Sequence, residues 1–187
     1  MSRVIHVFRQ PDRFIAGTVG EPGDRSFYLQ AVEDARTVSV LLEKQQVAVL
    51  AERLAALLDE VRRRFGADVP AADGDDVDTE PLSVPVEEEF RVGTMGLGWD
   101  SESRSVVVEL LAVTEEEIDE SVVLDDTDEG PDAVRVFLTP VQARAFATRA
   151  ERVVTAGRQP CPLCAEPLDA DGHICPRQNG YRRVIAS

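Results

Sequence analysis

The amino-acid sequence predicts an α+β protein made of two tandem, pseudo-symmetric units, each an antiparallel sheet followed by one helix. In each half of the chain, β-branched and aromatic runs separated by turn residues precede an apolar repeat of helical spacing. Short segments of the first half also return, in the same order, in the second half. Cysteines near the C-terminus add a small predicted zinc knuckle to this body.

The first unit is expected to span residues 1–66. Four runs rich in β-branched and aromatic residues predict an antiparallel meander, because Pro, Gly and Asp turn signals separate them. These runs are Val4–Phe8, Arg13–Val19, Ser26–Val32 and Thr37–Leu42. Apolar residues then recur at intervals of three and four from Val47 to Phe65, which predicts a helix, and Gly66 is expected to end it.

Residues 67–80 are acidic and nearly devoid of large apolar side chains, so we expect a flexible linker over 67–84. The second unit is expected to span 85–157, with an acidic insertion loop at 114–131. Thr139 suits the N-cap of its helix, and Pro140 suits the first helical position. Residues 158–187 are expected to form the zinc knuckle and a basic tail.

Two ordered matches indicate an internal duplication. Phe14–Gly20 matches Phe90–Gly96, and Leu41–Gln46 matches Phe137–Gln142 at the entrance to each helix. The second match places Ala51 opposite Ala147 and Arg53 opposite Arg149. The offset grows from 76 to 96 residues, which the insertion loop accounts for. Chance similarity among Val, Gly and Leu is the alternative, whereas a true duplication would allow a cleft between the halves.

The strongest chemical signal is the sequence CPLCAEPLDADGHICPR, in which a C-x2-C motif precedes an H-x-C motif. Its donors are Cys161, Cys164, His173 and Cys175. Three thiolates and one imidazole form a closed tetrahedral set for one structural Zn²⁺, which leaves no position for a reacting water. The one-residue spacer before Cys175 is tighter than usual, so Asp169, Asp171 or another group stays open as the fourth ligand in place of His173.

Other candidate residues have structural interpretations. His6 lies in an alternating strand and is expected to be half-buried rather than a general base. The glycine clusters of the two units do not match the dinucleotide-binding pattern and suit bulges and hairpin turns. The acidic runs 87–89 and 115–117 are expected to be solvated, and Trp99 is expected to pack in the core or a hairpin.

The net charge of −15 is concentrated in the middle of the chain, where residues 65–131 carry 2 basic and 21 acidic side chains. Such a chain is repelled by nucleic acid at long range. The tail nevertheless combines basic and aromatic side chains in the way that binds phosphates and stacks bases. Its relevant residues are Arg177, Tyr181, Arg182 and Arg183. A solvated tail is the alternative interpretation.

The cysteine count also bears on the compartment. Three cysteines, all within the last thirty residues, make a poor disulfide framework and favour a reducing environment. The sequence opens without an apolar leader, and no stretch approaches the roughly 18 apolar residues of a membrane span. We therefore expect a cytoplasmic protein without a membrane-spanning segment.

Several longer segments carry a family resemblance. They are RFIAGTVG and GDRSFYLQA in the first unit, FRVGTMGLGWD in the second, and CPLCAEPLDADGHICPRQNGYRR at the end. Together they resemble an uncharacterised actinobacterial family, a domain of unknown function with a C-terminal CPLC...GHxCPR zinc-knuckle motif. The resemblance covers nearly the whole chain. It implies a cytoplasmic location, but no activity and no catalytic residues.

No set of catalytic side chains converges in the sequence, and the predicted metal site is closed. We therefore expect a non-catalytic protein-interaction module, stabilised by Zn²⁺, whose partner is another protein. Nucleic-acid binding through the knuckle and the tail is the first alternative. An enzyme with its site in the cleft between the two units is the second.

Overall fold

The computed structural model describes residues 3–21, 23–70, 77–115, 123–127 and 129–156. These residues contain seven strands and two helices. The first half holds β1 (Ile5–Phe8), β2 (Arg13–Glu21), β3 (Asp24–Glu33), β4 (Arg36–Leu42) and α1 (Lys44–Phe65). The second half holds β5 (Glu88–Asp100), β6 (Ser105–Ala112), β7 (Ala133–Leu138) and α2 (Pro140–Thr155).

All seven strands form one mixed sheet in the order β1-β7-β6-β5-β4-β3-β2. The pairs β2–β3, β3–β4, β5–β6 and β6–β7 are antiparallel. The pairs β1–β7 and β4–β5 are parallel. The predicted α+β class and the mostly antiparallel pairing are therefore confirmed.

The position of β1 corrects the predicted four-stranded meander. Instead of pairing with β2, β1 lies at the far edge of the sheet and pairs with β7. Backbone bonds extend this pairing, since Ala133 N donates to Val4 O at 2.9 Å. β1 covers an edge of β7 that would otherwise expose unpaired backbone groups. Pro11, in the link between β1 and β2, has no N–H with which to continue a hairpin ladder.

The expectation of a separate sheet for each unit is also wrong. Strands of both halves join through the parallel pair β4–β5, so the two meanders share one sheet. This pairing provides hydrogen-bond partners for the backbone groups of β4 and β5, which would be exposed at the edges of two sheets if each half formed its own. The internal duplication itself stays a prediction.

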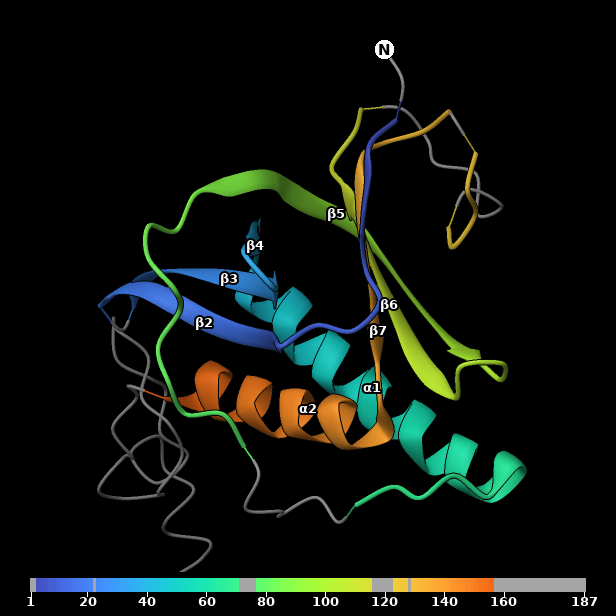
Figure 1. Cartoon of the computed structure of the whole chain (residues 1–187). Coiled ribbons are helices and arrows are strands. Elements are labelled where there is room, and N and C mark those ends of the chain that lie inside the picture. Colours follow the sequence, from blue (N-terminus) through green and yellow to red (C-terminus); the bar gives the residue numbers. More distant parts are fainter. Residues whose placement is uncertain (1–2, 22, 71–76, 116–122, 128, 157–187) are drawn as a thin grey trace, which may run out of the picture.

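Both helices lie side by side against one face of the sheet (Figure 1). They contact each other extensively, and α2 also packs on β2, while α1 contacts β5 and β3. The helix of each half therefore reaches the first meander strand of the other half. The expected sheet-on-helix layering is present, but each helix packs on strands of both halves.

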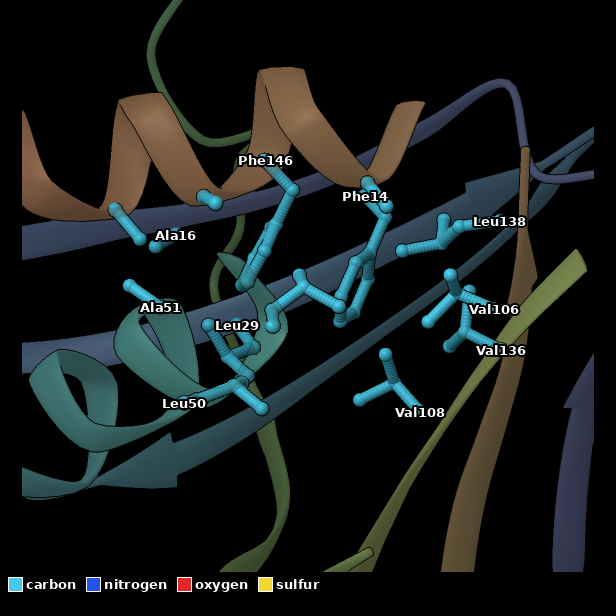
Figure 2. Close-up of a cluster of buried hydrophobic side chains, with 14 of the residues drawn as sticks. Phe14, Ala16, Leu29, Leu50, Ala51, Val106, Val108, Val136, Leu138 and Phe146 are labelled. Carbon is cyan, nitrogen blue, oxygen red and sulfur yellow. The ribbon is translucent and has the colours of Figure 1, made fainter. Parts of the chain in front are cut away.

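One hydrophobic core fills the space between the helices and the sheet. Phe14, Leu29 and Leu50 come from the first half, and Val108 and Phe146 from the second (Figure 2). The rings of Phe14 and Phe146 stack with centroids 4.6 Å apart. Because the two halves bury each other's side chains, neither half has a core of its own.

Each helix carries, in its first turn, a glutamine that also ties it to the other half of the chain. At α1, Glu43 N donates to Gln46 Oε1 at 2.7 Å, and Gln46 Nε2 donates to Val92 O at 3.0 Å. At α2, the predicted N-cap Thr139 accepts from Gln142 N at 3.1 Å. Gln142 Nε2 then donates to Pro11 O at 3.0 Å. The predictions for Thr139 and Pro140 are confirmed, and Gly66 ends α1 in the left-handed conformation.

The described ends of the expected linker 67–84 pack against the sheet and the helices and are not exposed along their whole length. Ala67 and Val69 are buried in the core. Leu82 is buried over Gly17, where an added Cβ would lie 2.5 Å from Leu82 Cγ. The scarcity of large apolar residues led to the linker prediction, but three small or medium ones suffice to anchor the two ends.

The connection from β6 to β7 spans the residues of the expected insertion loop. Val123 faces Gly96 and Leu124 faces Gly98, both on β5. These glycines alternate with Met95 and with other side chains packed on the core, so they face away from the helices. The described part of the loop, 123–127 with 129–131, therefore contacts the sheet face opposite the helices.

Candidate functional site

A cavity of about 140 Å³ lies between β2 and α2, and thus between the two halves of the chain. Its walls combine charged side chains with aromatic and aliphatic ones. The lining residues are Asp12, Arg13, Phe14, Ile15, Asp78, Gln142, Ala145, Phe146 and Arg149. Strand β2 supplies the first wall, helix α2 supplies the second, and the chain between α1 and β5 supplies Asp78.

Arg149 is the most deeply placed charge of this cavity, with only 8% of the residue exposed. Its Nε donates to Ala16 O at 2.8 Å, and its Nη1 donates to Asp78 O at 2.7 Å and to Asp78 Oδ1 at 3.3 Å. Nη2 has no hydrogen-bond partner among the described residues. The guanidinium is therefore fixed on two sides and has donors left over.

Asp78 accepts hydrogen bonds from two arginines, Arg13 and Arg149. Arg13 forms a two-pronged pair with it, at 2.6 Å from Nε to Oδ2 and 3.1 Å from Nη2 to Oδ1. The hydrogen bond from Arg13 holds the pKa of Asp78 below its usual range, with a smaller contribution from the charge of Arg149. Burial lowers the pKa of Arg149; Asp78 opposes this shift, while the like charge of Arg13 adds to it. Arg149 is thus only partly compensated.

Replacing Asp78 with asparagine is expected to lower the free energy of unfolding by roughly 1–3 kcal/mol at neutral pH, because two arginines lose their carboxylate. The native pKa of Asp78 lies below its unfolded value of about 3.9, so its contribution is present above that pH. It is lost as the pH falls through the native pKa. Urea unfolding from neutral to acidic pH should show the gap between wild type and variant closing below about pH 4. Asp68→Asn, at an exposed position, is the control.

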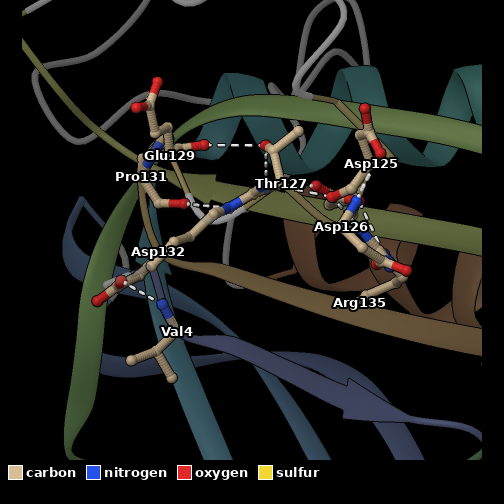
Figure 3. A network of polar contacts seen from close by, with 10 residues as sticks. Val4, Asp125, Asp126, Thr127, Glu129, Pro131, Asp132 and Arg135 are labelled. Carbon is tan, nitrogen blue, oxygen red and sulfur yellow. Dashed lines mark hydrogen bonds and ion pairs between the residues drawn. The ribbon is translucent and has the colours of Figure 1, made fainter. Parts of the chain in front are cut away.

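A second charged cluster lies on the opposite face of the sheet. Glu109, fully buried on β6, accepts from Arg3 at 3.1 Å and from Arg135 at 3.0 Å. Arg135 also pairs with Asp126, and its Nη2 donates to Asp125 O at 2.8 Å (Figure 3). Burial disfavours the charged form of Arg135, but the hydrogen bonds to Asp126 and Glu109 outweigh this and raise its pKa.

The positive and negative charges of this second cluster are paired with one another, whereas Arg13 and Arg149 of the cavity share the carboxylate of Asp78. Arg3 donates from Nε to Pro131 O at 2.7 Å, and thereby ties the N-terminal segment to the β6–β7 connection. Each charged group of the cluster has an opposite charge within bonding distance. We interpret the cluster as a structural clamp.

A shallow apolar groove of about 350 Å³ lies between α1 and β5. Its lining is mostly aliphatic, with one charge of each sign. The lining residues are Leu50, Arg53, Ala56, Leu57, Glu60, Met95 and Leu97. Trp99 packs against the core and stacks with Phe65, which is 48% exposed, at 6.0 Å between ring centroids. The packing role predicted for Trp99 is confirmed.

The site residues predicted from the sequence lie outside the described residues. This holds for the metal ligands Cys161, Cys164, His173 and Cys175, and for the tail residues Arg177, Tyr181, Arg182 and Arg183. Within the described part of the chain, no group of three or more His, Cys, Asp or Glu side chains could hold a metal ion. His6 is half-buried, as expected, with Nε2 3.8 Å from Glu89 Oε2.

The residues around the cavity were not singled out as a site in the sequence. Arg149 did carry a signal of burial in the sequence. It lies within the apolar stripe of α2, between Phe146, three residues earlier, and Ala150, the next residue. An arginine on such a face must find buried partners. The identity of those partners, Ala16 and Asp78, follows only from the fold.

A family model described as "Protein of unknown function (DUF3090)" matches residues 6–175, which is nearly the whole chain. The chain belongs to the DUF3090 family. This membership confirms the expected domain of unknown function, whereas the actinobacterial origin and the C-terminal motif stay predictions. The matched region ends at Cys175, so it includes all four predicted metal ligands and excludes the basic tail.

No curated protein and no solved structure matches the chain. Among the described residues, no helix is both long and apolar enough to cross a membrane.

Proposed function

We propose that this DUF3090 protein is a non-catalytic protein-interaction module that presents the groove between α1 and β5 to another protein. The groove carries the proposal because its lining is mostly aliphatic, and the stacked rings of Phe65 and Trp99 lie further along the same helix and strand. A few residues supply most of the affinity in protein interfaces, and Trp, Tyr and Arg are enriched among them. Met95 adds an adaptable surface, since a thioether repacks easily around different partners.

The charges of the groove specify the chemistry of the partner. Glu60 is already paired, with its Oε1 3.2 Å from Arg64 Nε. Arg53 is exposed and forms no ion pair with the described residues. A short apolar segment with an acidic residue at one end would fill the aliphatic floor and pair with Arg53. We commit to such a segment of another protein as the occupant.

Arg53→Glu is expected to abolish capture of this partner by the purified full chain, because like charges then meet at the edge of the groove. Arg152→Glu, at an exposed position on α2, is the matched control and should leave capture unchanged. A charge reversal in the captured partner, from acid to lysine, should restore binding to the Arg53→Glu variant. Capture that is equal for both variants would contradict the proposal.

We further propose that Cys161, Cys164, His173 and Cys175 bind one structural Zn²⁺ that orders the C-terminal region. The donor set supports this, since C-x2-C and H-x-C pairs provide four tetrahedral ligands. The family match supports it as well, because it extends to the last of the four donors. A closed set would serve the stability of the region and not a reaction.

Purified protein is expected to contain about one zinc per chain, and Cys161→Ser should lose it, because a serine hydroxyl is a poor replacement for a thiolate. Elemental analysis after extensive dialysis measures the stoichiometry. His6→Asn is the control, since His6 is the other histidine of the sequence and should not affect the metal. His173→Asn tests the fourth ligand. Stoichiometric zinc in Cys161→Ser would refute the assignment.

We also propose that the two halves arose by duplication. Each half contains three antiparallel strands followed by a helix, which is compatible with that origin. Gln46 and Gln142, aligned in the sequence, both sit in the first turn of a helix and bond the backbone of the other half. A solved structure in which residues 13–65 and 88–155 do not superpose would exclude it.

The two other functions stay alternatives. Nucleic-acid binding by Arg177, Tyr181, Arg182 and Arg183 predicts an affinity that falls with salt and is lost in the Arg182→Ala, Arg183→Ala double variant. An enzyme would use the cavity between the halves. Its described lining offers two carboxylates, and that of Asp78 is held in ion pairs by Arg13 and Arg149, which makes it a weak nucleophile or base.

A further inference from the structure

The two buried arginine clusters of this protein differ in how far their charge is balanced. Arg135 contacts two carboxylates, Glu109 and Asp126, and its pKa is raised. Arg149 shares the single carboxylate of Asp78 with Arg13, and its pKa is lowered. A buried guanidinium with half a counter-charge is costly unless another anion joins it.

The unused donors of Arg149 have access to the cavity. Its Nη2 forms no hydrogen bond with the described residues. It is also not sealed from solvent, since Arg144 Nε is the one fully enclosed side-chain nitrogen or oxygen without a partner in the described part. Arg149 lines the cavity and is 8% exposed, so the cavity is where these N–H groups remain reachable.

The apolar walls of the cavity indicate the chemistry of the uncharged part of a ligand. Phe14 and Phe146 are stacked and buried, and Ile15 and Ala145 add aliphatic surface. A volume of about 140 Å³ is close to that of the engineered apolar cavity, about 150 Å³, that takes up benzene. The space therefore fits a molecule of a few heavy atoms that has one anionic end and one apolar end.

We propose that the cavity between β2 and α2 binds a small monocarboxylate, with its carboxylate on Arg149 Nη2 and its apolar body against Phe14, Phe146 and Ala145. The lining of the cavity explains why the ligand should carry one negative charge and not two. Two aspartates, Asp12 and Asp78, accompany the two arginines there and would repel a dianion such as phosphate. This site is independent of the groove between α1 and β5, which lies on the other helix.

An NMR titration of the isotopically labelled full chain with butyrate tests the site, followed at the signals of Ile15 and of the Arg149 Nε–H. Butyrate should shift these signals saturably, with roughly millimolar affinity for so small a ligand. The isosteric neutral amide, butyramide, and inorganic phosphate at equal ionic strength should not shift them. Binding of either as tight as that of butyrate would overturn the proposal.

Two variants locate the ligand. Arg149→Gln should weaken butyrate binding at least about tenfold, because the charge-assisted hydrogen bonds are lost. Arg152→Gln, an exposed arginine of the same helix, is the matched control and should bind as wild type does. Ala145→Leu fills the cavity without removing a charge and should also abolish binding. If Arg149→Gln fails to fold, the Ala145→Leu variant tests the site by itself. An unchanged affinity of Ala145→Leu for butyrate would refute the proposed site.

Discussion

Replacing Glu109 with alanine is expected to destabilise the fold by about 3–5 kcal/mol, the range found when one partner of a buried ion pair is removed. Glu109 is fully buried, and it is the carboxylate that Arg3 and Arg135 share. The side chain of Arg3 is itself fully buried in this pair, so it would be left as an uncompensated charge. Arg135 would keep Asp126, which is largely exposed and screened by solvent.

Urea unfolding of the full chain measures this loss. Glu102→Ala is the matched control, because Glu102 is exposed in the turn between β5 and β6 and its side chain has no ion pair in the described part of the chain. Glu109→Gln should lose less than Glu109→Ala, since the amide oxygen still accepts one hydrogen bond. A loss below about 1 kcal/mol for Glu109→Ala would show that solvent or neighbouring groups replace the carboxylate.

The parts of the fold that could be predicted are those that local rules decide. The repeat from Val47 to Phe65 identified α1 because one helix face is buried along its whole length. Thr139 and Pro140 identified the start of α2 because capping depends on a few neighbouring residues. The positions of β1 to β4 could also be predicted, because alternation and turn residues mark these strands locally.

The pairing of strands could not be predicted in the same way. Alternation shows which face of a strand is buried, but it does not identify the neighbouring strand. The parallel pair β1–β7 joins residues about 128 apart, as in the contact between Val4 and Asp132. The pair β4–β5 crosses the segment that its composition marked as a linker. Both pairings follow from edges that had to be covered, which is a property of the assembled sheet.

The candidate site was hidden for a related reason. Its key contacts join Arg149 to Ala16, 133 residues away, and to Asp78, 71 residues away. Glu109 did carry a local signal, since it interrupts an apolar run in β6. An acid in such a run must be paired when buried, but Arg3 and Arg135 could be identified only once the sheet brought them together.

Phe146→Ala is expected to cost about 3–5 kcal/mol, the usual range for deleting a buried aromatic ring. Phe146 is 2% exposed and lies in the centre of the shared core. Stacking on Phe14 should contribute roughly 0.5–1.5 kcal/mol of this, which a double-mutant cycle with Phe14→Ala can separate. Val141→Ala, 48% exposed on the same helix, is the control and should change stability by less than about 0.5 kcal/mol.

The shape of the unfolding curve of Phe146→Ala carries a further expectation. Phe146 belongs to the second half of the chain, whereas Phe14 and Leu50 belong to the first, and all three are in one core. Loss of the ring should therefore lower the stability of both halves together, in a single transition. Fluorescence of Trp99, on β5, and circular dichroism of the helices should report the same midpoint. Two separate midpoints would mean that the halves fold independently, against the shared sheet and core.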